Sequence, residues 1–69
     1  MELSARNIIK GTVTAVDVGD VNAEVRVEIA PDVVVTSVIT KRSCERLGLE
    51  VGKEAYVVIK ATSVMVGAE

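Results

Sequence analysis

The sequence contains no histidine, tryptophan or phenylalanine, and Tyr56 is its only aromatic residue. Without histidine, the chain lacks the usual general base near neutral pH and the commonest ligand of transition metals. With one aromatic residue, it lacks the stacking surface on which single-stranded nucleic acids are bound. No nucleophile can be combined with a base, so we expect a protein that is not an enzyme.

Cysteine and basic charge are also scarce. Cys44 is the only cysteine, which excludes an internal disulfide and a cysteine-cluster metal site. The formal net charge is −2 and no basic stripe is present to neutralise phosphates. No apolar run reaches the roughly 20 residues of a membrane span, and the chain does not open with a signal-type segment. We therefore expect a cytoplasmic protein without cofactor, nucleic-acid partner or membrane partner.

What the sequence has in excess is apolar surface. Hydrophobic residues make up 49% of the 69 residues, which we expect to form one domain over residues 1–69. A domain of this size hides only roughly 60% of the surface that its extended chain would expose. The surplus favours association of identical subunits.

The first half of the chain has the period-two alternation of strands with one buried face. Residues 9–29 predict a hairpin, with a turn at Gly19-Asp20. Its second strand would direct alternate residues to one side, namely Val21, Ala23, Val25, Val27 and Ile29. Gly11, inside the first strand, indicates a bulge or a close backbone approach.

The middle of the chain changes from strand to helix. Pro31-Asp32 predicts a turn, and the apolar run over residues 33–39 predicts a strand with both faces covered, the second by another layer of protein. A short helix would begin at Thr40 as N-cap and end at Gly48. Leu47 and Leu49 would then pack beneath the barrel.

The remaining residues complete the predicted fold. Glu50 to Lys53 would form a turn, residues 54–66 one long or broken strand, and residues 67–69 a frayed tail. This order is typical of an all-β protein with one short helix, a small five-stranded Greek-key barrel of the oligonucleotide/oligosaccharide-binding (OB) type that is oligomeric. Such barrels serve many functions, so the site must be argued from its residues.

Two polar stretches rich in hydrogen-bond donors flank the strands. One is Ser4-Ala5-Arg6-Asn7, just before the first apolar run, and the other is Lys60-Ala61-Thr62-Ser63, which interrupts the last one. We expect the two stretches to meet, within one subunit or across a subunit boundary, and to bind a small anion.

These stretches also carry a family likeness. Together with Gly11-Thr12-Val13, Gly19 to Val25, Val38-Ile39-Thr40 and Leu47-Gly48-Leu49, they resemble the molybdate-binding Mop domain, a TOBE-like domain whose freestanding members are the molbindins. The resemblance spans essentially the whole chain. It implies an intracellular protein of molybdenum homeostasis that binds and stores molybdate or tungstate. It also implies a homo-hexamer, a trimer of dimers, with oxyanion sites between subunits.

The resemblance places a first oxyanion site on matching positions that supply donors. Molybdate is a tetrahedral dianion whose oxygens only accept hydrogen bonds, so its site needs many donors and few carboxylates. Molybdenum or tungsten would thus be bound as the oxyanion, without direct side-chain ligands to the metal. The residues of this first site would be Ser4, Ala5, Arg6, Thr40, Ser43, Lys60 and Ala61.

A second oxyanion site, on a symmetry axis, would lie near Val21, Asn22 and Ala23. There Glu24 would have to pair with a base such as Arg26 or Lys10. Two alternatives remain open for the chain as a whole. One is a molybdate-sensing module of a transporter or transcription regulator, and the other is an oligonucleotide-binding OB-fold protein.

Overall fold

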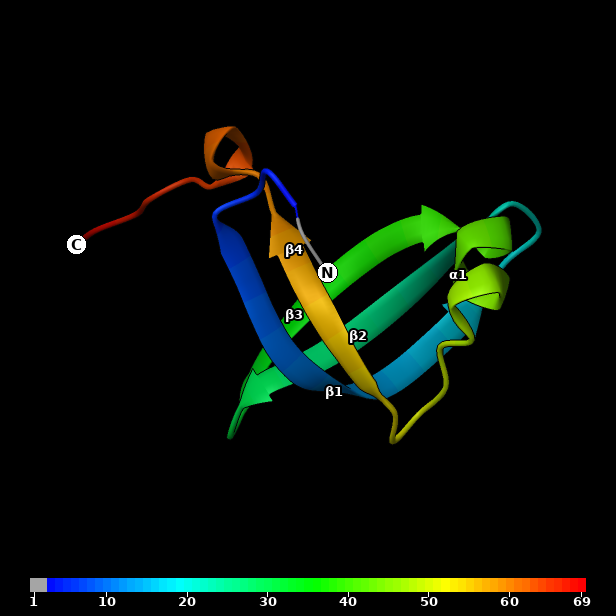
Figure 1. The fold of residues 1–69 in the computed structure, drawn as a ribbon. Coiled ribbons are helices and arrows are strands. Elements are labelled where there is room, and N and C mark those ends of the chain that lie inside the picture. Colours follow the sequence, from blue (N-terminus) through cyan, green and yellow to red (C-terminus); the bar gives the residue numbers. More distant parts are fainter. Residues whose placement is uncertain (1–2) are drawn as a thin grey trace.

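The computed structural model describes residues 3–69, which form one antiparallel sheet and one short helix (Figure 1). The strands are β1 (Asn7–Val18), β2 (Asn22–Ala30), β3 (Val33–Thr40) and β4 (Glu54–Ile59). The helix α1 (Lys41–Leu47) connects β3 to β4, and a 3-10 turn, η1 (Ala61–Ser63), follows β4. The strand order is β3-β2-β1-β4, so β3 and β4 are the edges.

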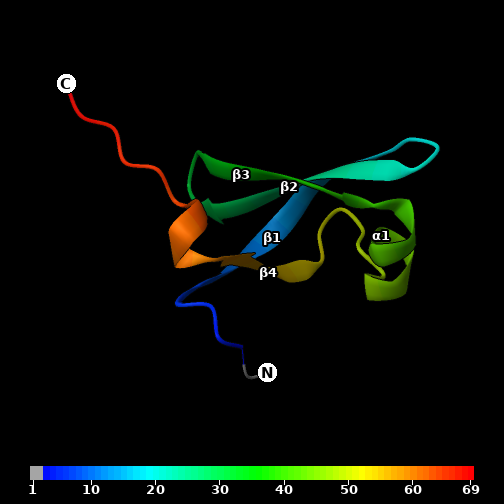
Figure 2. The same cartoon turned by 90° about the horizontal axis from the view of Figure 1, so that it is seen from above.

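The sheet curls strongly because two features of β1 permit it. The register of β1 against β2 shifts between Val13 and Ala15, which is the signature of a β-bulge. Gly11 lets the backbones approach closely, since a Cβ atom at Gly11 would lie 2.5 Å from the carbonyl oxygen of Glu28. Figure 2 shows the result, with β3 and β4 on opposite sides of the interior. The close approach expected at Gly11 is confirmed.

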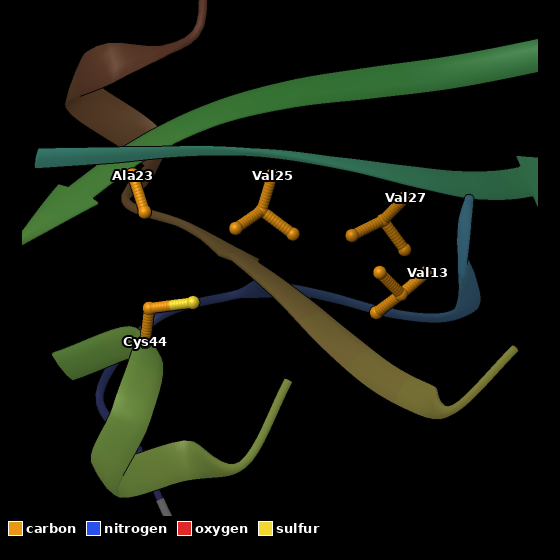
Figure 3. Packing of buried hydrophobic residues seen from close by; sticks show 5 residues of the cluster. All are labelled: Val13, Ala23, Val25, Val27 and Cys44. Atoms are coloured by element: carbon orange, nitrogen blue, oxygen red, sulfur yellow. The ribbon is translucent and has the colours of Figure 1, made fainter. Parts of the chain in front are cut away.

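The core lies inside this curl and is small. It comprises Val13, Ala23, Val25, Val27 and Cys44, each at most 5% exposed. Figure 3 shows the Cys44 side chain directed from α1 toward the valines of the sheet. The alternation predicted for β2 is confirmed for Ala23, Val25 and Val27, which are buried, whereas Val21 lies outside the strand and is 72% exposed.

The helix begins and ends where its capping residues predict. The Thr40 hydroxyl accepts a hydrogen bond from the Ser43 N–H at 3.0 Å, and Gly48 has the left-handed conformation that ends many helices, with φ of 63°. One prediction about this segment is wrong: Leu47 is 63% exposed, because it lines an open groove that residues 3–69 do not fill. Leu49 packs against the core as expected.

The strand expected over residues 54–66 ends at Ile59, so the described residues form four strands and not five. The Ser63 N–H donates to the Lys60 carbonyl at 2.8 Å, which closes a 3-10 turn in place of a ladder. Beyond it, the chain runs away from the body (Figures 1 and 2), with Met65 and Val66 95% and 93% exposed. A strand needs a neighbouring strand, and residues 64–66 have none within the described chain.

Apolar surface stays uncovered along the open side of the sheet. The two unpaired edges border a groove of about 480 Å³, lined by Ser37 and Ile39 of β3 and by Ala55 and Val57 of β4, among others. On β3, Val38 is 67% exposed. The second layer expected over residues 33–39 is therefore not supplied by residues 3–69 of the same chain.

Candidate functional site

The β1–β4 ladder brings the two donor stretches together at one end of the sheet. Asn7, the first residue of β1, pairs with Ile59, the last residue of β4. The chain that leads into β1 contains Ser4 to Arg6, and the chain that leaves β4 begins with Lys60. The dark blue and orange segments meet at this end in Figure 1. The structure thus confirms that the two stretches meet within one chain.

The arrangement at this end, the β1–β4 end, leaves donors available. Within residues 3–69, neither the Ser4 hydroxyl nor the Lys60 ammonium takes part in a side-chain hydrogen bond or an ion pair. The first N–H groups of a helical turn have no carbonyl partner inside the turn, which applies to Ala61 at the start of η1. Ser4, Arg6, Lys60 and Ala61 are all exposed. An anion would therefore meet an ammonium, a hydroxyl and backbone donors here.

Thr40 and Ser43 lie at the opposite end of the sheet, beside α1, which we call the helix end. The Thr40 hydroxyl donates to Ser43 Oγ at 2.8 Å while it accepts the Ser43 N–H. The Thr40 proton is thus used within the chain, and of the two hydroxyls only that of Ser43 keeps a proton for an outside acceptor.

The residues of the expected second site also lie at the helix end. Asn22 pairs with Thr40 across the β2–β3 ladder, and the Lys41 N–H donates to the Val21 carbonyl at 2.7 Å. Ala23 is 1% exposed and directs its side chain into the core, so only its backbone could contact a ligand. Val21 and Asn22 are exposed.

A polar hollow of about 540 Å³ lies next to these residues. Its lining includes Lys41 and Arg42, two bases that the sequence reasoning did not assign to a site, together with the carboxylates of Asp20 and Glu45. The carboxylates oppose an anion, whereas the bases favour one. The signal for the bases was present in the sequence, since both directly follow Thr40.

The seven residues of the expected first site therefore form two groups within one chain. Ser4, Ala5, Arg6, Lys60 and Ala61 lie at the β1–β4 end, and Thr40 and Ser43 lie at the helix end. The 12-residue strand β1 runs between the two ends, and Figures 1 and 2 both show η1 and α1 on opposite sides of the molecule. One anion cannot contact both groups of the same chain.

Two ion pairs lie outside these groups in the part of the chain that the structure describes. Lys10 lies 3.2 Å from Glu54, and Arg26 lies 3.8 Å from Glu24. The expectation that a base neutralises Glu24 beside the second site is thus confirmed. Among residues 3–69, no group of three or more His, Cys, Asp or Glu side chains could hold a metal ion.

Membrane spanning by a helix finds no support in the structure. None of the helices in residues 3–69 combines the length and the apolar character that a membrane crossing requires.

Comparison with known proteins gives consistent matches over nearly the whole chain. The family model described as the TOBE domain matches residues 3–66. A "Probable molybdenum-pterin-binding protein" of Haemophilus influenzae is 51% identical over 69 residues, and the match covers 100% of both chains. "Molybdenum transport protein ModE" of Azotobacter vinelandii is 44% identical over 69 residues, which are 100% of this chain but 26% of that protein.

Two solved structures have the same fold. MopII from Clostridium pasteurianum superposes with a TM-score of 0.90 at 45% identity, covering 97% of this chain and 100% of that one. The cytoplasmic molybdate-binding protein ModG, with molybdate bound, gives a TM-score of 0.83 at 46% identity, covering 88% of this chain and 43% of that one. The expected OB-like fold class, mostly β with one short helix, is thereby confirmed.

Proposed function

The chain belongs to the TOBE domain family, and from this membership we propose that it binds molybdate or tungstate as an intact oxyanion. The observation that carries the proposal is the meeting of Ser4–Arg6 with Lys60–Ala61 at the β1–β4 end. The donors there are an ammonium, a hydroxyl and backbone N–H groups, and no carboxylate of residues 3–69 is paired with Lys60. Charge-assisted bonds of this kind are the strong ones for an anion.

The names of the relatives support molybdate as the ligand. The molybdate in the ModG structure occupies a protein 46% identical to this chain, and the Haemophilus influenzae relative is named for molybdenum and pterin. A site built from neutral donors and one ammonium suits reversible storage and release of a dianion. We therefore propose a binding role in molybdenum homeostasis, without catalysis, in the cytoplasm, the location that the ModG description gives for that protein.

The chain is proposed to act as a homo-oligomer with anion sites between subunits. Two features of the structure support this. The donors of the expected first site are divided between the β1–β4 end and the helix end of the sheet, so a second copy would supply Thr40 and Ser43. The open groove, the exposed β3 side chains and the apolar residues Met65 and Val66 leave surface that association would bury. A hexamer, a trimer of dimers, is the assembly that the resemblance to the molbindins implies.

Thermal melts test the binding proposal. An anion that binds the folded assembly and not the unfolded chain stabilises by mass action, about 2.7 kcal/mol at a free concentration of 100 times the dissociation constant. We expect sodium molybdate to raise the melting midpoint and sodium chloride at equal ionic strength to leave it unchanged. An unchanged midpoint at saturating molybdate contradicts the proposal. Native mass spectrometry of the same sample gives the subunit count.

A second candidate function is a molybdate-sensing module within a longer protein. The match to ModE, of which this chain corresponds to 26%, favours it, because ModE carries a similar segment in a longer chain. Storage and sensing differ in how the fraction of occupied molybdate sites depends on the supply of molybdate. Co-purification of this chain with bound molybdenum at full occupancy supports storage, whereas occupancy that follows molybdate supply over a narrow range supports sensing.

A further inference from the structure

One side chain connects the two donor stretches at the β1–β4 end. The amide nitrogen Nδ2 of Asn7 donates to the carbonyl oxygen of Ile59 at 3.2 Å, and the bond is partly buried. Among residues 3–69, it is the only side-chain hydrogen bond between the segment around Ser4–Arg6 and the segment around Lys60. It lies where both segments leave the sheet, since Asn7 begins β1 and Ile59 ends β4.

We propose that Asn7 is a positioning residue, which fixes the spacing between the donors of Ser4–Arg6 and those of Lys60–Ala61. This inference rests on the proposed oxyanion-binding function. A tetrahedral dianion is bound well only when its donors are held at the right separation before it arrives, because donors that must be ordered on binding cost affinity. The Asn7 bond restricts the Ile59 carbonyl, and the next peptide carries Lys60 into the 3-10 turn.

The chemistry of asparagine suits this place beside an anion. Its amide is a neutral donor, so it holds the carbonyl without adding negative charge. An aspartate of the same shape offers no proton when ionised, and its charge would repel the dianion. Partial burial strengthens the bond relative to one fully in water.

The fold has little need of this bond. The β1–β4 ladder already pairs residues from Asn7↔Ile59 to Thr12↔Glu54. Asn7 is not part of the buried cluster or of the apolar side chains packed against it. Loss of the bond should therefore leave the sheet intact and loosen only the ends of the two segments.

Variants of the full chain separate positioning from a purely structural role. Asn7→Leu and Asn7→Ser remove the donor, one with similar bulk and one with less, and Asn7→Gln keeps a neutral amide donor. Thr14→Val is the matched control, because Thr14 also donates from β1 to a strand carbonyl, that of Arg26 at 3.4 Å, away from the donor stretches. Calorimetry measures the dissociation constant for sodium molybdate, and the melting midpoint without molybdate is recorded for each variant.

We expect Asn7→Leu and Asn7→Ser to weaken molybdate binding by about tenfold, which corresponds to about 1.4 kcal/mol and lies at the upper end for a net hydrogen bond. Asn7→Gln should recover most of the affinity, and Thr14→Val should bind like the wild type. The midpoints without molybdate should shift alike in the Asn7 and Thr14 variants.

Three results have distinct meanings. If the wild type binds molybdate and both donor-deleting variants bind equally well, the positioning role is overturned while the proposed function stands. If Asn7→Gln binds as weakly as Asn7→Leu, the donor is not the cause and the inference is again overturned. If the wild type itself does not bind molybdate, the proposed function fails. One of the two deletions suffices for the test if the other does not fold.

Discussion

Replacement of Gly11 by alanine tests how tightly the curl of the sheet is built. A Cβ atom at this position would lie 2.5 Å from the Glu28 carbonyl oxygen and 2.7 Å from Cγ1 of Val27. Neither neighbour can move freely, since the first is backbone in the β2 strand and the second belongs to a core side chain that is 5% exposed. The added methyl group must therefore separate β1 from β2.

We expect Gly11→Ala to destabilise the fold by about 2 kcal/mol, which is typical of overpacking in a close-packed interior. For a domain of this size, that lowers the melting midpoint by roughly 8–16 °C. Circular dichroism melts at one fixed protein concentration measure the shift, and Gly67→Ala is the control, because no atom lies within 4 Å of the corresponding Cβ position. Equal midpoints for the two variants would refute the close approach of the backbones.

Two further predictions concern charged and capping residues. Lys60→Ala should weaken molybdate binding by about tenfold or more, because one charge-assisted hydrogen bond is lost. Lys53→Ala removes the same charge from a residue bonded to the Gly48 carbonyl at 3.2 Å and should change only stability. Equal losses of affinity in calorimetry would contradict the assignment of Lys60 to the site. Thr40→Val removes the N-cap of α1 and should lower the free energy of unfolding by about 1 kcal/mol. Thr36→Val is the control, because Thr36 is an exposed strand residue without a side-chain hydrogen bond within residues 3–69, and it should not destabilise the fold. A melting midpoint of Thr40→Val that is no lower than that of Thr36→Val would rule out the capping contribution.

The local features of the fold could be read from the sequence because each depends on neighbours in the chain. The alternation over residues 22–29 identified the buried face of β2, because side chains of a strand alternate between its faces. Thr40 and Gly48 marked the helix ends, since both act on backbone groups within a few residues. The need for glycine at position 11 was also visible, as an interruption of the strand pattern.

The candidate site was predictable only in part. The donor character of Ser4–Arg6 and of Lys60–Ala61 is written in their residue types, and their meeting follows once the first and last strands pair. The hydrogen bond of Asn7 could not be predicted, because its partner is the carbonyl of Ile59, 52 residues away. Lys41 and Arg42 directly follow Thr40 in the sequence, but the hollow that they line with Asp20 and Val21 forms only through the pairing of β2 with β3.

The amino-acid order by itself determined which face of β2 is buried, where the helix is capped and which side chains can donate to an anion, since these depend on short-range geometry and chemistry. Only the tertiary structure decided that Thr40 and Ser43 lie at the opposite end from Lys60, and that residues 64–66 leave the sheet without a partner. Strand pairing and register are set by contacts between distant parts of the chain, and a segment becomes a strand only where another edge is free to pair with it.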